Sequence, residues 1–95
     1  MQFSLVLITL NAGSTLQQCL ESCAKLTDDI VVVDSGSQDN TIEIAQQYQA
    51  KVIHQKWLGF GKQKQFAVAQ AKYDWVLCLD ADEWLCIVSS KHPER

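Results

Sequence analysis

The sequence lacks any apolar run approaching the ~20 residues that a membrane-spanning helix requires, so no transmembrane segment is expected. The apolar stretch 1–10 has no Lys or Arg before it and no small-residue cleavage pattern after it, which argues against a signal peptide. With a net charge of −3, the chain also lacks the positive charge that attracts nucleic acid or an anionic membrane. We therefore expect a cytoplasmic protein that does not bind nucleic acid.

Cysteine pairs and proline are scarce as well. No Cys-x-x-Cys pair occurs, and all four cysteines lie within apolar patterns: Cys19, Cys23, Cys78 and Cys86. This pattern favours reduced thiols in a core over disulfides or a zinc site. The single proline, Pro93, lies in the polar stretch 89–95, which predicts no further element. We expect one domain over residues 1–88 and a polar C-terminal tail over 89–95.

Apolar segments rich in β-branched residues alternate with segments of helical spacing. Strands are expected at 3–10, 30–34, 51–54 and 75–80, with helices between them. Four parallel strands that alternate with three helices predict an α/β fold, an open sheet in the order 3-2-1-4 with helices on both faces. In that order the strand that begins at Trp75 lies at an edge of the sheet.

Two of the expected helices begin with a capping signature. Ser14 with Gln17 marks the first helix, and Asn40 with Glu43 marks the second, which should run for about three turns. The third helix is expected over 62–71, where good helix formers are concentrated.

Three carboxylates directly follow the apolar strand that begins at Trp75: Asp80, Asp82 and Glu83. Side chains two residues apart on a strand project to the same side, so Asp80 and Asp82 can act as a pair. Hard divalent cations such as Mg²⁺ or Mn²⁺ bind carboxylate oxygens and leave positions for water and substrate phosphates. An isolated Asp-x-Asp also occurs where a strand simply meets solvent, so the pair alone does not define a metal site.

The strands of a parallel sheet all end at one edge, so the residues at those ends should converge. They are Thr9, Asn11, Asp34 and Asp80. A carboxylate at the end of the second strand can accept hydrogen bonds from a ribose hydroxyl or a base N–H, which makes Asp34 a candidate nucleotide ligand. Its alternative role is to cap amides of its own loop. Asp39 is a further candidate, although helix capping explains it adequately.

The stretch 59–65 contains two glycines and two lysines but does not match a phosphate loop. Gln63 follows the first lysine where that loop requires Ser or Thr, and the third glycine of a dinucleotide fingerprint is absent. Lys62 and Lys64 could lend positive charge to a diphosphate, or could equally be solvated helix lysines. Just before this stretch, Trp57 is expected to pack under the domain rather than line a ligand cleft.

Three ordered motifs can be compared with known families: VVDSGSQDNT at 32–41, GFGKQKQ at 59–65 and WVLCLDADEW at 75–84. Together they resemble family 2 glycosyltransferases, and most of all the branch that builds the lipopolysaccharide core. The likeness covers about residues 3–85. It implies a GT-A fold, a UDP-sugar donor and a divalent metal, either Mn²⁺ or Mg²⁺. By position, Asp34 would contact the uridine, Asp80 the ribose or the metal, and Asp82 the metal that bridges the diphosphate.

The resemblance also implies a reaction, in which a sugar passes with inversion from the nucleotide-sugar to a saccharide or lipid-linked saccharide acceptor. Family members continue well beyond the acid motif and supply the acceptor pocket and the general base there. No catalytic base is therefore assigned in this chain, and weak or no transfer is expected from it alone. The complete enzyme is expected in the cytoplasm, where peripheral association with the inner membrane would bring it to a lipid-linked acceptor.

Two other classes of protein stay open at this point. One is a nonenzymatic fragment, either a passive nucleotide-binding module or a relic. The other is a phosphoacceptor signalling domain, which would need paired acids at the end of the first strand, where this chain has Leu10 and Asn11.

Overall fold

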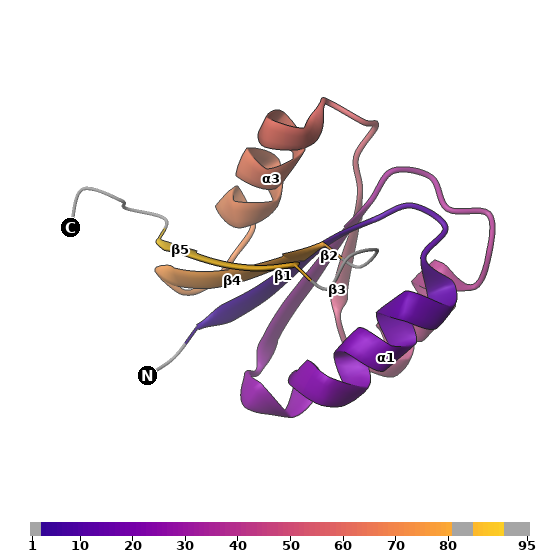
Figure 1. The fold of residues 1–95 in the computed structure, drawn as a ribbon, viewed down its shortest axis with the longest axis horizontal. Coiled ribbons are helices and arrows are strands. Elements are labelled where there is room, and N and C mark those ends of the chain that lie inside the picture. The colour runs from indigo at the N-terminus through magenta and orange to yellow at the C-terminus, as the bar shows by residue number, and fades with distance from the viewer. Residues whose placement is uncertain (1–2, 81–84, 91–95) are drawn as a thin grey trace.

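The strands of this chain form a single sheet (Figure 1). The structure is a computed structural model and describes residues 3–80 and 85–90. The strands are β1 (Ser4–Thr9), β2 (Asp29–Asp34), β3 (Lys51–His54), β4 (Trp75–Asp80) and β5 (Leu85–Ser90). Their order is β3-β2-β1-β4-β5, with β1 to β4 parallel and β5 antiparallel to β4. The predicted parallel order 3-2-1-4 is confirmed.

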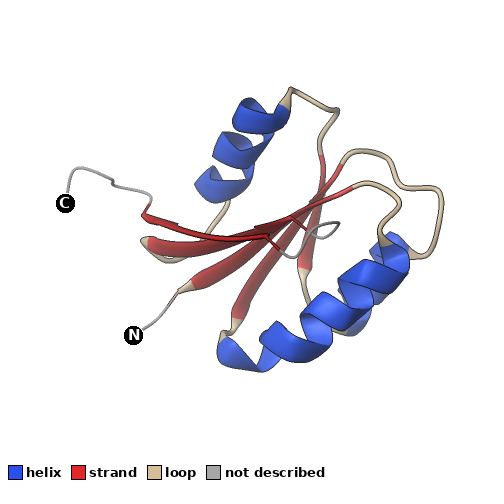
Figure 2. Cartoon of the chain, viewed as in Figure 1, coloured by secondary structure: helices blue, strands red, loops and turns tan. Residues whose placement is uncertain are grey.

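Helices cover both faces of the sheet (Figure 2). One face carries α1 (Gly13–Cys23) and α2 (Thr41–Gln47), and the other carries α3 (Phe60–Ala69). A short 3₁₀ turn, Ala24–Leu26, follows α1. Over the described ranges, none of these helices combines the length and the apolar character needed to cross a membrane.

The core follows directly from the alternation of side chains along the two central strands. Leu5 and Leu7 of β1 pack with α1 and α2, whereas Val6 between them packs with α3 on the opposite face. β2 behaves in the same way, with Ile30 and Val32 on one side and Val31 and Val33 on the other. Both faces of these strands are therefore buried, which explains their continuous apolar sequence.

The fifth strand was not expected from the sequence. β5 begins within the apolar segment and reaches into the serines predicted to open a polar tail, because Ser89 pairs with Val76 and Ser90 with Trp75. A four-residue apolar run gives little local signal, and the strand is stabilised by hydrogen bonds to β4 that no local pattern reveals. The expectation that β4 lies at an edge was wrong, since β4 lies between β1 and β5.

Two helix starts also differ from the capping signatures. α1 begins at Gly13 with Ala12 as its N-cap residue, so Ser14 lies inside the helix and does not cap it. Asn40 is the N-cap residue of α2, but its side chain makes no capping hydrogen bond. α2 has 7 residues, about two turns rather than three. The caps come instead from side chains of the loop before α2, described below.

Candidate functional site

The strand register brings the ends of four strands to one edge of the sheet. Thr9 at the end of β1 lies opposite Asp34 of β2, and Asp34 lies opposite His54 of β3. On the other side of β1, Ile8 lies opposite Asp80, the last residue of β4. Thr9, Asp34 and Asp80 therefore share this carboxyl edge, whereas Asp82 lies outside the described residues.

Asp34 is fully buried at this edge and its carboxylate accepts four hydrogen bonds. Oδ1 accepts the hydroxyls of Thr9, at 2.7 Å, and of Ser37. Oδ2 accepts the backbone N–H groups of Gly36, at 2.9 Å, and Ser37, at 2.7 Å. The carboxylate thus organises the loop that follows β2, which is the arrangement that its alternative role as a loop cap would produce.

These contacts also set the charge state of Asp34. Burial disfavours the ionised carboxylate, but the hydrogen bonds from the Ser37 hydroxyl, the Ser37 N–H, Thr9 and Gly36 together outweigh it. The pKa of Asp34 therefore lies below its ordinary value, and the residue carries a negative charge at neutral pH. A carboxylate in this state accepts hydrogen bonds from any N–H or O–H group. A ligand N–H or O–H can therefore replace one of the four protein donors.

The loops after β1 and β2 are joined by further hydrogen bonds beyond the strand ends. The Ser35 N–H donates to the Thr9 carbonyl at 3.1 Å and so continues the strand pairing by one residue. Asn11, with a left-handed φ of 51°, donates its N–H to the Ser37 hydroxyl at 2.8 Å. Its side-chain oxygen accepts the Gln38 N–H, also at 2.8 Å. The two loops therefore form one rigid rim in which the predicted site residues Thr9, Asn11 and Asp34 meet.

Asp39 supplies the helix caps that the sequence signatures placed elsewhere. Its carboxylate accepts the Gly13 N–H at 3.2 Å, at the start of α1, and both the N–H and the hydroxyl of Thr41, at the start of α2. The bond to the Thr41 hydroxyl is the main reason that the pKa of Asp39 is lowered. The Thr41 hydroxyl in turn accepts the Ala12 N–H at 3.0 Å. The side chain is exposed, and capping accounts for its contacts.

Two glycines allow these loops to come so close. A Cβ on Gly13 would lie 2.1 Å from the Asn40 side-chain oxygen, so the start of α1 admits no side chain without displacing Asn40. Gly36 has a φ of 116°, a conformation that favours glycine. It is this backbone that turns the Gly36 and Ser37 N–H groups onto Asp34.

Gln63 is a residue of this region whose role the sequence did not reveal. It is fully buried on α3, and its amide bonds to Leu58 and Gln55 of the loop before α3 and to Ser35 of the loop after β2. The sequence signals this residue only by its position, since Gln63 occupies the place where a phosphate loop requires Ser or Thr. Trp57 in the same loop is 50% exposed, so the prediction that it packs under the domain was wrong.

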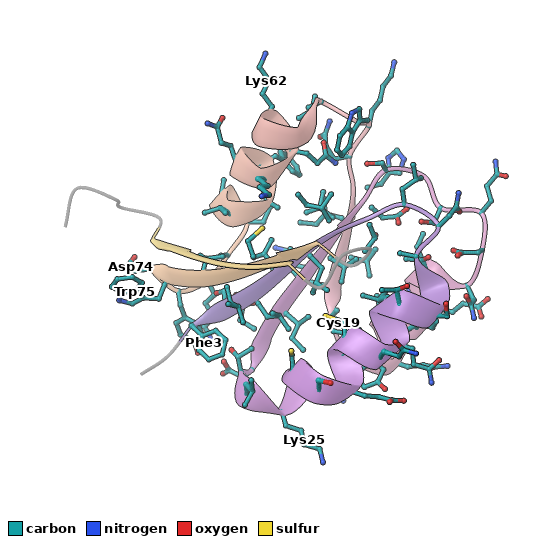
Figure 3. All side chains as sticks on the ribbon, in the orientation of Figure 1. Phe3, Cys19, Lys25, Lys62, Asp74 and Trp75 are labelled. Atoms are coloured by element: carbon teal, nitrogen blue, oxygen red, sulfur yellow. The ribbon has the colours of Figure 1, made fainter. Side chains whose placement is uncertain are left out.

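The two lysines of α3 occupy different environments. Lys62 is exposed and extends from α3 away from the sheet (Figure 3), as expected for a solvated helix lysine. Lys64 is half-buried.

No metal-binding group is found in the part of the chain that the structure describes, where no three His, Cys, Asp or Glu side chains come together. The predicted ligand pair includes Asp82, outside the described residues, and Asp80, of which only the backbone is described. The donor set itself, two carboxylates at a strand end, suits a hard divalent cation that completes its coordination with water and phosphate.

Polar loops that converge at the carboxyl edge of a parallel sheet are the arrangement by which open α/β domains bind nucleotides. A sequence model described as glycosyl transferase family 2 matches residues 4–85. This chain belongs to family 2 of the glycosyltransferases, and the resemblance carried by its three motifs is confirmed.

Individual relatives agree with this assignment. An uncharacterized glycosyltransferase of Rickettsia conorii is 42% identical over 84 residues, which cover 88% of this chain and 30% of the relative. The lipopolysaccharide core biosynthesis glycosyltransferase LpsC of Rhizobium meliloti is 38% identical over 87 residues, covering 86% and 32% respectively. The chain therefore spans about a third of the length of these relatives.

Solved structures show the same fold. Glucosyl-3-phosphoglycerate synthase from Mycobacterium tuberculosis, in complex with UDP, superimposes with a TM-score of 0.74 at 28% identity, over 85% of this chain and 34% of that chain. A second structure of that enzyme contains Mn²⁺, UDP and glucosyl-3-phosphoglycerate and gives a TM-score of 0.73 at 27% identity, over 84% and 33%. The GT-A fold expected from the resemblance is confirmed.

Proposed function

We propose that residues 1–88 form the donor-binding part of a glycosyltransferase, which holds a UDP-sugar and a divalent metal at the carboxyl edge of the sheet. The observation that carries the proposal is the rigid rim around Asp34, formed by the loops after β1 and β2. A similar fold in glucosyl-3-phosphoglycerate synthase has been solved with Mn²⁺ and UDP, which supports the same ligand class here.

In this proposal Asp34 binds the nucleoside by exchanging one of its donors. The two backbone N–H groups on Oδ2 belong to the folded loop, whereas the Ser37 hydroxyl on Oδ1 can rotate away. A base N–H or a ribose hydroxyl would then take its place on a carboxylate that is already ionised and oriented. Thr9 and Asn11 contribute by holding the rim in place, and Lys64 contributes positive charge near the diphosphate.

Asp80 and Asp82 would hold the metal, because paired carboxylates are the ligands that Mg²⁺ and Mn²⁺ prefer in proteins. A cation bound there supplies Lewis-acid stabilisation of the negative charge that develops on the departing diphosphate. Asp80, next to Ile8 in the sheet register, would also lie close enough to the rim to contact the ribose.

The acceptor is proposed from the relatives. Similarity to LpsC supports a saccharide of the lipopolysaccharide core, or a lipid-linked precursor of it, as the acceptor of the complete enzyme. The complete enzyme would act in the cytoplasm at the inner membrane surface. Because the chain spans about a third of its relatives, we propose that it binds the donor but transfers sugar weakly or not at all, unless the remaining segments are supplied.

The proposal is tested by the melting temperature of the chain with Mn²⁺ alone, with UDP alone and with both. Ligand at 100 times its dissociation constant adds about 2.7 kcal/mol to the free energy of unfolding. For a domain of this size that raises the melting temperature by roughly 10 °C or more. We expect a shift that requires both ligands. A melting temperature that neither ligand changes would contradict donor binding and would favour the relic among the nonenzymatic alternatives.

Two variants serve as matched controls in this experiment. Asp82→Ala should abolish the joint shift, because the metal loses one of its two carboxylates. Glu83→Ala removes the neighbouring carboxylate and should leave the shift intact. Equal loss in both variants would show that the acid motif acts only through its overall charge.

A further inference from the structure

Gln63 has a buried side-chain amide whose every hydrogen-bonding group contacts one of two loops at the carboxyl edge. It is fully buried although glutamine is mostly found at protein surfaces. Its Oε1 accepts the Leu58 N–H at 3.1 Å. Its Nε2 donates to the Ser35 hydroxyl at 3.1 Å and to the Gln55 carbonyl at 3.2 Å. One side chain thus joins the loop before α3 to the loop after β2.

The orientation of this amide is fixed by its partners. A backbone N–H can only donate and a backbone carbonyl can only accept, so Oε1 must face Leu58 and Nε2 must face Gln55. The reversed amide would place two acceptors together at Gln55 and two donors together at Leu58. The amide therefore acts as a clamp with a single arrangement, which distinguishes it from a buried glutamine that merely fills space.

The clamp closes on the segment that carries the candidate nucleotide ligand. Ser35 directly follows Asp34, and the Asp34 carbonyl accepts the Gln55 N–H at 2.9 Å. On the opposite side of this segment, the Ser35 N–H donates to the Thr9 carbonyl. The end of β2 is thus held by β1 on one side and by Gln63 and Gln55 on the other, so the position of the Asp34 carboxylate depends on both.

We propose that Gln63 is a positioning residue of the nucleotide site, which sets the affinity for a nucleoside diphosphate by fixing the loop before α3 against Ser35. The inference rests on the proposed function. It follows from the general rule that a site already ordered before binding loses less conformational freedom when the ligand arrives. Without the clamp, the loop before α3 and the loop after β2 would have to become ordered when the ligand binds, and the affinity would fall.

The test uses Gln63→Met, which keeps the length of the side chain and removes its polar groups. The matched control is Gln70→Met at the C-cap of α3, where the side-chain amide donates to the Phe66 carbonyl one turn earlier, at 3.3 Å. The dissociation constant for UDP is measured by calorimetry in saturating Mn²⁺, well below the melting temperature of each variant. We expect it to rise about tenfold or more in Gln63→Met and to stay within about twofold in Gln70→Met.

Amide hydrogen exchange of the ligand-free chain gives a second readout that does not depend on nucleotide. In Gln63→Met, exchange should become faster at Leu58, which loses its acceptor, and also at Gly36 and Ser37, which donate to Asp34. A buried amide with a purely local structural role would change Leu58 alone. If Gln63→Met fails to fold, Ser35→Ala replaces it, because it removes the contact between the Gln63 amide and the loop after β2 and leaves the bonds to Leu58 and Gln55 in place. Exchange at Gly36 and Ser37 should then still become faster.

The outcomes separate the inference from the function on which it rests. An unchanged dissociation constant in Gln63→Met, beside measurable binding by the wild type, would overturn the role of Gln63 alone. Unchanged exchange at Gly36 and Ser37 would overturn the coupling between the loops, whether or not UDP binds. A wild-type chain that fails to bind UDP would instead overturn the proposed function.

Discussion

The two ends of the β1–β2 pair carry the same kind of contact in different surroundings. At the amino end the Ser4 hydroxyl donates to the Asp29 carboxylate, and at the carboxyl end the Thr9 hydroxyl donates to the Asp34 carboxylate. In both pairs the two residues lie directly opposite each other in the strand register. The difference between the ends therefore lies in what else each carboxylate binds.

At the amino end, the remaining partners belong to the connection between α3 and β4. The Lys72 N–H donates to Asp29 at 2.8 Å, and the Tyr73 N–H donates to the Ser4 hydroxyl at 3.0 Å. Trp75, at the start of β4, lies at this end of the sheet (Figure 3). These contacts attach the α3–β4 crossover to the sheet.

At the carboxyl end, the partners belong to a loop that encloses the carboxylate. Asp34 is bonded by Gly36 and Ser37, and that loop is bonded in turn to Asn11. A similar hydroxyl–carboxylate pair thus serves as a structural tie at the amino end and, in the proposed function, lies at the centre of the nucleotide site at the carboxyl end. The loops around the pair determine its role, and substitutions at the two ends test this difference.

The largest expected effect is that of Asp34→Ala compared with Asp29→Ala. Removing Asp34 leaves buried hydroxyl and N–H donors unsatisfied and should lower the free energy of unfolding by roughly 3–5 kcal/mol, against roughly 1–2 kcal/mol for the partly exposed Asp29. Urea denaturation followed by circular dichroism measures both. If Asp34→Ala does not fold, Asp34→Asn gives the comparison. Equal losses at the two ends would contradict the distinction drawn between them.

A smaller effect is expected from alanine at two glycines. Gly36→Ala forces a side chain into the left-handed conformation at φ 116° and should cost roughly 1–3 kcal/mol. Gly61, within α3, has no atom within 4 Å of an added Cβ, so Gly61→Ala should stabilise the chain by about 0.5–1 kcal/mol. Thermal melts of the two variants should therefore shift in opposite directions. A Gly36→Ala variant as stable as the wild type would show that the loop after β2 does not require the left-handed backbone conformation at Gly36.

The smallest effect is a difference in pH dependence. The pKa of Asp34 is lower in the folded state than in the unfolded state, where it is about 3.9. The unfolded state therefore binds more protons in acid, and the stabilisation is complete above roughly pH 5 and lost as pH falls through the folded-state pKa. Asp34→Asn should flatten the decline in melting temperature between roughly pH 5 and 3. Part of the decline should remain in the variant, because the pKa of Asp39 is also lowered in the folded state.

Most of the fold could be predicted from the sequence because the central strands are buried on both faces. Such strands are continuous apolar runs, and their boundaries matched β1 to β4 to within a residue or so. β5 could not be predicted, because its last two residues are serines and its stability comes from pairing with β4. The cap of α1 was also missed, because its donors bind Asp39 and Thr41, more than twenty residues away in the sequence.

The candidate site could be predicted from the sequence only in part. Topology alone placed Thr9, Asp34 and Asp80 at one edge, since parallel strands end together. The four hydrogen bonds of Asp34 and the clamp formed by Gln63 depend on the conformation of loops, which residue types do not determine.

The central claim is that ligand binds at the carboxyl end of the sheet and not at the amino end. Paramagnetic broadening of backbone amide signals by Mn²⁺, in the presence of UDP, tests it most directly because the effect falls steeply with distance from the ion. We predict that signals of Asn11 and of residues 35–39 broaden at Mn²⁺ levels that leave Asp29, Lys72 and Tyr73 sharp. Broadening that begins at the amino end, or that is equal at both ends, would contradict the account.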